Sequence, residues 1–374
     1  MATKQTGKKG KTAAAARKAK KKQKRIILFI VEILVLAVLV AVLYTVLKAD
    51  NIQKIQVDEE NIVTKVNENV ENNESLKGYR NIALFGVDSR EGDLGKGTRS
   101  DSIIIASINE DSGDIKLCSV YRDTYLNLSN DSYNKCNSAY AKGGPEQAII
   151  MLNMNLDLNI TDYVTIGFDG LTGVIDALGG VYVDVSEAEI SHLNNYQISM
   201  VGTTSDGQTF TATEGKDYTA VTSAGYQKLN GLQATAYCRI RHVGDDFERA
   251  ERQREVLASV MDEAKKASVG DLNKILNEVL PHVATSLDVD EMASMLSNVA
   301  KYSIEGSDGF PFESNRATGK VGGKGSCVIP NNLAQNVEML HEFLFNEAGY
   351  TVSPQVQSYS DKIAADTGYS GKTE

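Results

Sequence analysis

Hydrophobic positions along the chain form one long uninterrupted run and many short ones. The long run, residues 26–47, has Glu32 as its only charged position. A helix of this length spans roughly 30 Å, the thickness of the hydrocarbon core of a bilayer. It therefore predicts a single transmembrane helix. The alternatives are a buried core helix or a cleaved signal peptide, but the run is long for a signal peptide and no Ala-x-Ala site follows it.

The short runs indicate an α/β fold, because brief apolar segments alternate with segments of helical spacing. Strands are expected at residues 80–87, 102–108, 115–120, 163–168, 181–185 and 234–240. Helices are expected at residues 145–155, 169–178, 223–229, 246–267, 271–280, 290–302 and 331–346. This order predicts a mixed central sheet sandwiched by helices.

Polar composition marks the segments outside these runs. We expect a stalk or linker at residues 48–78, the extracellular globular domain at residues 79–350, and a flexible tail at residues 351–374. Within the domain, residues 191–219 lose their periodicity and predict a surface excursion. Residues 303–325 are rich in glycine and predict a loop.

Charge is distributed unevenly along the chain. Residues 1–25 contain eleven Lys or Arg and no acid, and such a cluster beside a membrane span remains in the cytoplasm. We therefore expect a cytoplasmic head at residues 1–25, a single pass through the cell membrane, and an extracellular C-terminal domain. Residues 48–374 carry a net charge of −20, which argues against nucleic acid as a partner.

The four cysteines are an even number in a domain expected outside the cell, so disulfides are permitted. They are Cys118, Cys136, Cys238 and Cys327. No C-x-x-C spacing suggests a metal site. Buried free thiols are the alternative to one or two bridges, and the pairing stays open.

Five of the twelve arginines fall in one short stretch, residues 237–254. On the predicted strand, Arg239 and Arg241 point to one face. Asp246 is expected to cap the next helix, on which Arg249 and Gln253 are four positions apart and face inward. Inward guanidinium groups need carboxylates or a bound anion, and their forked donors match phosphate oxygens.

The alternative for these arginines is an internal network of ion pairs. Asp245, Asp246 and Glu248 are near in sequence and could neutralise them. Arg252 and Arg254 could be solvated or pair with neighbouring glutamates. For several arginines together, a bound anion is the favoured interpretation.

Carboxylates and further arginines occur where the predicted strands begin or end. Asp88 closes the first strand, Arg99 and Asp101 open the second, and Arg122 and Asp123 follow the third. Asp at such a position is commonly a cap or a turn residue. However, two carboxylates beside arginines could also hold Mg²⁺ with substrate phosphates, as phosphoryl transfer requires.

Other familiar sites are not matched. Residues 95–98 lack the spacing of a phosphate-binding loop, no G-x-S-x-G motif is present, and the histidines lack metal spacing. Only His242, inside the arginine stretch, is a candidate for lining a site.

Taken in order, these short motifs resemble the LytR-CpsA-Psr proteins of Gram-positive cell envelopes. They are Gly86-Val87-Asp88-Ser89-Arg90, Arg99-Ser100-Asp101, Tyr121-Arg122-Asp123-Thr124, Asn137-Ser138-Ala139-Tyr140, Arg239-Ile240-Arg241, Asp245-Asp246-Phe247-Glu248-Arg249 and Arg252-Gln253. The resemblance covers about residues 79–260 together with the single span. Two departures are Tyr121, where many members carry Pro, and His242, where an aromatic residue is commoner.

The resemblance implies transfer of a teichoic acid or capsular polysaccharide from undecaprenyl pyrophosphate to peptidoglycan. A sugar hydroxyl of peptidoglycan attacks the sugar-linked phosphate and expels lipid monophosphate. Asp88 and Asp101 then bind Mg²⁺ or Mn²⁺. The implied catalytic residues are Asp88, Arg99, Asp101, Arg122, Asp123, Arg241 and Arg249, and the substrate-binding ones are Arg90, Arg239, Asp246, Arg252 and Gln253.

The polyprenyl chain is expected in an apolar groove between the sheet and the helices at residues 145–155 and 247–261. Two other functions stay open. One is a non-catalytic envelope sensor or transcription attenuator, and the other is a pyrophosphatase that hydrolyses the lipid carrier without an acceptor.

Overall fold

The computed structural model describes residues 55, 57–88, 94–202, 209–268, 270, 272, 275 and 279–369. The predicted head at residues 1–25 and the predicted membrane span at residues 26–47 lie outside these residues. Among the described helices, none is both long and apolar enough to cross a bilayer.

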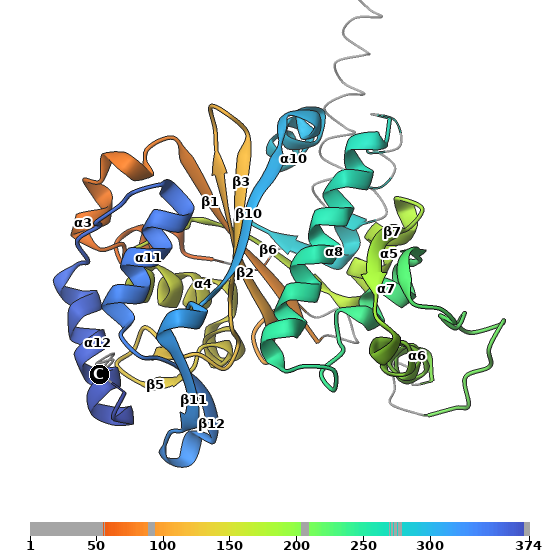
Figure 1. Cartoon of the computed structure of the whole chain (residues 1–374). Coiled ribbons are helices and arrows are strands. Elements are labelled where there is room, and N and C mark those ends of the chain that lie inside the picture. The colour runs from red at the N-terminus through yellow and green to blue at the C-terminus, as the bar shows by residue number, and fades with distance from the viewer. Residues whose placement is uncertain are drawn as a thin grey trace, which may run out of the picture. The chain divides into compact units, whose positions relative to one another are not determined.

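A mixed sheet forms the centre of the described domain, as predicted, and it has six strands (Figure 1). Its spatial order is β10 (Ser303–Phe310), β3 (Asp114–Val120), β2 (Ser100–Asn109), β1 (Tyr79–Val87), β6 (Asp162–Gly167) and β9 (Val283–Thr285). β2 runs antiparallel to both β1 and β3, whereas β6 runs parallel to β1. The end of β1, the start of β2 and the end of β6 therefore lie next to one another, along the edge of the sheet that is formed by strand ends.

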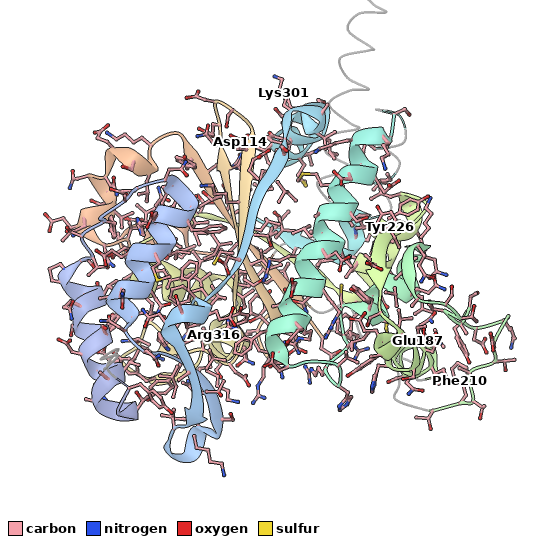
Figure 2. The ribbon with its side chains drawn as sticks, in the orientation of Figure 1. Asp114, Glu187, Phe210, Tyr226, Lys301 and Arg316 are labelled. Carbon is pink, nitrogen blue, oxygen red and sulfur yellow. The ribbon has the colours of Figure 1, made fainter. Side chains whose placement is uncertain are left out.

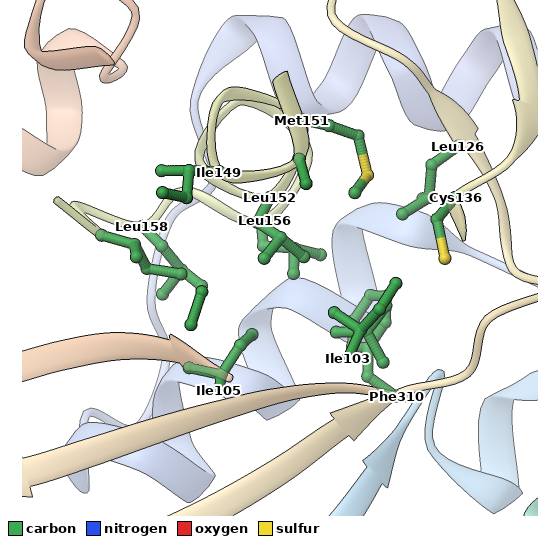
Figure 3. Close-up of a cluster of buried hydrophobic side chains, with 14 of the residues drawn as sticks. Ile103, Ile105, Leu126, Cys136, Ile149, Met151, Leu152, Leu156, Leu158 and Phe310 are labelled. Carbon is green, nitrogen blue, oxygen red and sulfur yellow. The ribbon is translucent and has the colours of Figure 1, made fainter. Parts of the chain in front are cut away.

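Both faces of the sheet are buried, which explains why β2 reads as a continuous apolar run. Ile103 and Ile105 belong to the core on one face, and Ile104 belongs to the core on the other. The first face packs against α4 (Asn137–Leu156), whose side chains meet those of β2 in Figure 3.

Helices cover both faces, in agreement with the predicted sandwich (Figure 1). α11 (Leu333–Phe345) and α12 (Pro354–Thr367) lie with α4 on the first face. On the second face, Leu257 and Met261 of α8 (Asp246–Lys266) and Met295 of α10 (Val289–Ser297) pack against the sheet.

A smaller apolar core lies beside α8 and contains one helix and one strand that we predicted the wrong way round. The elements are α5 (Phe168–Ala177), β7 (Val181–Val185), α6 (Glu187–Val201), β8 (Gly225–Leu229) and α7 (Gly231–Tyr237). β8 replaces the helix predicted at 223–229, and α7 occupies much of the strand predicted at 234–240. The reason is a capping box between Asn230 and Gln233 that starts α7. Because α7 is buried nearly all round, its periodicity resembles that of a buried strand.

Two segments predicted to be irregular contain regular secondary structure among their described residues. The excursion predicted at 191–219 begins inside α6, which Ser186 and Glu189 start with a capping box. The loop predicted at 303–325 contains β10, which pairs with β3 at the edge of the sheet. It also contains β11 (Arg316–Lys320), which forms a hairpin with β12 (Ser326–Pro330). A second small hairpin joins β4 (Tyr125–Asn127) to β5 (Tyr133–Lys135).

The C-terminal segment predicted to be a flexible tail forms α12 instead. Val356, Tyr359 and Ile363 lie on one face of this helix and are buried in the main core. The preceding turn is held by Asp157, which accepts a hydrogen bond from the Ser353 N–H at 2.7 Å. The spacing of the apolar residues in this segment is typical of a packed helix, and the prediction of a tail from the segment's composition missed it.

Residues 57–78, predicted as a stalk, form short helical turns against the same core. These are α2 (Glu59–Val63), α3 (Glu68–Glu71) and η1 (Glu74–Leu76), and each buries one apolar side chain. The four cysteines are free and buried, which agrees with the thiol alternative rather than with disulfides.

Replacing Ile363 by Ala should destabilise the protein by about 2–5 kcal/mol, because it opens a cavity beneath α12. Urea unfolding of the detergent-solubilised full chain measures this change. The matched control is Gln357→Ala on the exposed face of α12, which should change stability by less than about 0.5 kcal/mol. Equal unfolding midpoints for Ile363→Ala and the wild type would show that α12 does not stabilise the domain.

Candidate active site

A cavity of about 320 Å³ lies between the second face of the sheet and helices α5 and α8. Its apolar lining comes from β1, β2, β6, α5 and α8, and includes Leu84, Ile104, Val164, Ile166, Leu171, Val174, Val256, Leu257 and Val260. Its polar lining includes Asp88, Asp101, Arg239, Arg241, Arg249 and Gln253. The cavity thus combines a charged end, at the edge where β1 ends, with an apolar interior.

The position of side chains along α8 produces this division. Arg249 and Gln253 lie in its first two turns, and Val256, Leu257 and Val260 follow one to two turns later. The groove that we predicted against α8 therefore exists. Its other helix is α5 and not the segment 145–155, because α4 packs in the main core on the opposite face of the sheet.

An ion-pair network joins segments that are far apart in sequence at the charged end of the cavity. Arg122, directly after β3, contacts the carboxylate of Asp101 through Nη1 at 2.7 Å and that of Asp246 through Nε at 3.1 Å. Arg241 Nη2 lies 3.3 Å from the other oxygen of Asp101. The Asp101 carboxylate therefore contacts two arginines, one with each of its oxygens.

Arg249 is the most deeply buried arginine of this group, with 4% of its surface exposed. Its Nη1 lies 3.4 Å from Asp246, and its Nη2 donates to the backbone carbonyl of Asp101 at 3.0 Å. Its Nε is buried and has no protein hydrogen-bond partner. A buried donor without a partner favours a site that accepts an anion or a water molecule.

The electrostatics of the network also favour an anion. Burial lowers the pKa of Arg249 to about 10. The charge of Asp246 acts to raise this pKa, whereas the charges of Arg122 and Arg241 lower it further. Burial acts to raise the pKa of Asp246, but Arg249 and Arg122 outweigh it and lower that pKa. The network joins three arginines to two aspartates, so its formal charge is positive.

Arg239 and Arg241 lie in the loop after α7, not on the predicted strand, yet both line the cavity. Arg239 stacks over the ring of Phe168, 4.2 Å from its centroid, and lies 5.6 Å from that of Tyr196. Arg239 and Arg241 therefore reach the same cavity because they lie in one loop, not because they alternate along a strand.

Arg252, predicted to contact substrate, faces this loop and does not line the cavity. Its Nη1 forms a buried ion pair with Glu189 at 2.9 Å. Its Nη2 donates to the carbonyls of Ile240 and Val243 at 2.9 and 3.0 Å. Arg252 therefore fixes the loop that carries Arg241.

The cap of α8 is Asp245, one residue before the predicted Asp246. The Asp245 side chain accepts from the Phe247 N–H at 2.7 Å, and Glu248 completes a capping box. Asp246 is therefore free of capping and available to Arg122 and Arg249.

The remaining candidates are scattered around the site. Asp88 is exposed at the end of β1 and lines the cavity, whereas Arg99 is exposed and lies outside its lining. Asp123 pairs with Lys135 at 2.9 Å, with Arg122 Nε 4.0 Å away. Arg90 lies outside the described residues.

Two further candidates contact partners away from the cavity. Arg254 donates to Ser307 Oγ at 2.6 Å. The exposed His242 lies beside His192, with ring centroids 5.5 Å apart.

Sequence reasoning missed three residues of this region: Phe168, Tyr196 and Lys135. Phe168 had a signal, since it continues the spacing of Leu171 and Val174 along α5. Tyr196 lay in the predicted excursion, and nothing in the sequence pairs Lys135 with Asp123.

The carboxylates at the charged end suit a hard cation. Asp88 and Asp101 both line the cavity and offer only oxygen ligands. Among the described residues, no group of three His, Cys, Asp or Glu side chains could hold a metal. A cation here would therefore rely on one or two carboxylates with phosphate oxygens and water, the set that Mg²⁺ accepts.

Comparison with known proteins places this chain in a family. Residues 39–330 match the model of the LytR_cpsA_psr family. The polyisoprenyl-teichoic acid--peptidoglycan teichoic acid transferase TagU of Oceanobacillus iheyensis is 33% identical over 229 residues, which cover 59% of this chain and 62% of TagU. The corresponding transferase TagV of Bacillus subtilis is 27% identical over 286 residues, covering 72% of this chain and 65% of TagV.

Solved structures agree with this match. The crystal structure of B. subtilis TagV has a TM-score of 0.53 at 26% identity and covers 72% of this chain and 98% of TagV. A structure of TagT bound to LI-WTA has a TM-score of 0.57 at 20% identity, covering 76% and 97%, and shows a shared fold. This chain spans about three fifths of the TagU relative that it matches. Because the family model matches well over half of the sequence, the chain belongs to the LytR-CpsA-Psr family.

Proposed function

We propose that this protein transfers an anionic glycopolymer, of teichoic acid or capsular polysaccharide type, from a polyprenyl pyrophosphate carrier to peptidoglycan. The observation that carries the proposal is the convergence of Arg122, Arg241 and Arg249 at the charged end of an apolar cavity. The names of the TagU and TagV relatives support the same reaction.

The two ends of the cavity suit the two parts of such a carrier. A polyprenyl chain is apolar, and burying it beside Val256, Leu257 and Val260 removes it from water. A pyrophosphate has oxygens that match forked guanidinium donors. Arg249 offers an unused Nε, and Arg241 has a partly exposed side chain.

The proposed reaction forms one bond to phosphorus and breaks another. A sugar hydroxyl of peptidoglycan attacks the phosphorus linked to the glycopolymer, and the bond from that phosphorus to the bridging oxygen breaks. The bridging oxygen leaves with the polyprenyl monophosphate, and the hydroxyl proton passes to a base or to water. Arginines near the bridge stabilise the negative charge that develops there.

The other residues have supporting roles in this proposal. Asp101 and Asp246 hold the arginines at fixed distances, and Asp246 is ionised at neutral pH because its pKa is lowered. Arg252 holds the loop that carries Arg239 and Arg241. Gln253 Nε2 donates to the Cys238 carbonyl at 3.3 Å and contributes to the same loop.

Asp88 and Asp101 would hold Mg²⁺ or Mn²⁺ beside the pyrophosphate. Such an ion supplies positive charge that neutralises the leaving phosphate. Asp88 suits this role because its exposed carboxylate lines the charged end.

The proposed location is the outer face of the cell membrane. The predicted span at residues 26–47 anchors the chain, with the head at residues 1–25 in the cytoplasm and the domain at residues 79–350 outside. This arrangement brings the cavity to a carrier that is itself held in the membrane, and to peptidoglycan.

The direct test supplies full-length protein with a lipid-linked glycopolymer and peptidoglycan strands. The proposal predicts a covalent glycopolymer–peptidoglycan conjugate and release of polyprenyl monophosphate. Release of monophosphate without a conjugate would instead identify a pyrophosphatase. Neither product, with intact binding, would favour a non-catalytic sensor.

Replacing Arg122 by Ala should weaken binding of geranylgeranyl pyrophosphate by roughly 10–100-fold, since it removes charge-assisted hydrogen bonds. Isothermal titration calorimetry measures the affinity. Arg80→Ala is the control, because Arg80 pairs with Asp162 and Glu291 away from the cavity. Equal losses in both variants would contradict a local role for Arg122.

Replacing Asp88 by Asn should reduce the gain in affinity that Mg²⁺ gives by at least roughly tenfold. The side chain is exposed, so the melting temperature should stay unchanged. The measurement is ligand affinity during a titration from EDTA to excess Mg²⁺. An identical Mg²⁺ dependence in the variant and the wild type would remove Asp88 from the proposed metal site.

A further inference from the structure

A cluster of one cation and two aromatic rings joins the C-terminal hairpin to the charged end of the cavity. We define the aromatic clamp as Tyr121, Phe247 and Arg316. Arg316 is the first residue of β11 and lies at the base of the hairpin (Figure 2). It follows the short motifs within residues 79–260 but still lies inside the range that the family model matches, residues 39–330.

We propose that Arg316 is a positioning residue for the ion pair between Arg122 and Asp246. The inference rests on the proposed function, because that function assigns this ion pair to pyrophosphate binding. Arg316 would act through the aromatic clamp and not through contact with the substrate.

The contacts within the clamp are close and involve all three members. The Arg316 guanidinium carbon lies 3.7 Å from the Phe247 ring centroid and 5.2 Å from that of Tyr121. Arg316 Nη1 donates to the Tyr121 hydroxyl at 2.9 Å. The two rings meet edge to face, with centroids 4.5 Å apart. A guanidinium stacked on rings in this way is held by both charge and dispersion.

The two rings are direct neighbours of the ion pair. Tyr121 precedes Arg122, and Phe247 follows Asp246. The segments are 124 positions apart in sequence, yet Arg122 Nε and Asp246 Oδ2 are 3.1 Å apart. A contact that fixes the two rings relative to each other therefore restricts the two charged side chains beside them.

The hairpin also holds the Arg122 segment through the backbone. The Val328 N–H of β12 donates to the Asp123 carbonyl at 2.9 Å. The Tyr121 N–H donates to the Phe310 carbonyl at 3.0 Å. The segment is thus bound to the C-terminal part of the domain on both sides of Arg122.

Gly309 shows that the place of Tyr121 is tightly enclosed. A Cβ atom at position 309 would lie 2.0 Å from the Tyr121 hydroxyl oxygen. The backbone of β10 therefore leaves room for this ring only because residue 309 is glycine. The buried Tyr121 side chain thus packs directly against the backbone of β10, and its hydroxyl accepts a hydrogen bond from Arg316.

A direct substrate contact is the competing role for Arg316. Arg316 is absent from the residues that line the cavity, and Tyr121 and Phe247 contact its guanidinium. These observations favour positioning.

The first test compares Arg316→Met, Arg316→Lys and Lys320→Met in the full-length protein. Arg316→Met keeps an apolar side chain but removes the charge, so geranylgeranyl pyrophosphate affinity should fall about tenfold. Arg316→Lys keeps a cation over the rings and should recover part of the loss. Lys320→Met removes an exposed cation from the same strand and should change nothing. Wild-type affinity in Arg316→Met would overturn the proposal.

The second test adds Phe247→Leu, alone and with Arg316→Met. If Arg316 acts through the clamp, the affinity of the double variant for geranylgeranyl pyrophosphate should be about equal to that of the single variant with the lower affinity. If Arg316 contacts substrate, the two fold-changes should multiply, and positioning would be wrong.

Hydrogen exchange of the ligand-free protein separates this inference from the proposed function. Arg316→Met should speed exchange of the amides in the first turns of α8, residues 246–252, while Lys320→Met should not. Unchanged exchange in Arg316→Met would contradict the clamp even if binding were lost. If the wild type fails to bind the pyrophosphate, the proposed function fails, and the exchange result still decides whether Arg316 orders this segment.

Discussion

The need of a buried guanidinium for opposite charge controls the architecture of this site. Arg249 has almost no contact with solvent, and two other arginines lie close enough to lower its pKa. Asp246 supplies one counter-charge, and the backbone of Asp101 supplies an acceptor. These groups leave one buried donor of Arg249 without a protein partner. A bound anion would complete the network, which is why the site favours a phosphorylated ligand.

The fold places the charged groups at one end of a cavity because of where its elements begin and end. β1 ends at Val87 and β2 begins at Ser100, so Asp88 and Asp101 lie at the same edge of the sheet. α8 begins there too, which puts Arg249 at the charged end and Val260 in the interior. The amphipathic character of the cavity therefore follows from the order of residues along α8 together with the strand ends and the loop that meet at its first turns.

The sequence alone was sufficient for the four inner strands of the sheet and for grouping Arg239, Arg241 and Arg249, and insufficient for the edge strands β9 and β10 and for what surrounds them. β2 was readable because Ile103, Ile104 and Ile105 are buried on both faces. α7 was read as a strand because a short helix buried all round has no polar face. α12 was dismissed as a tail on composition, although Val356 and Ile363 carried a helical spacing. The pairing of Arg122 with Asp246 has no sequence signal, since it depends on tertiary packing.

The central claim is that the arginines of this network bind the pyrophosphate bridge of a lipid carrier. The most direct measurement is an experimental structure of the protein in complex with geranylgeranyl pyrophosphate. The account predicts density for the diphosphate within hydrogen-bond distance of Arg122, Arg241 and Arg249, with the prenyl chain between α5 and α8. A diphosphate bound elsewhere, with the network intact and unchanged, would contradict the account.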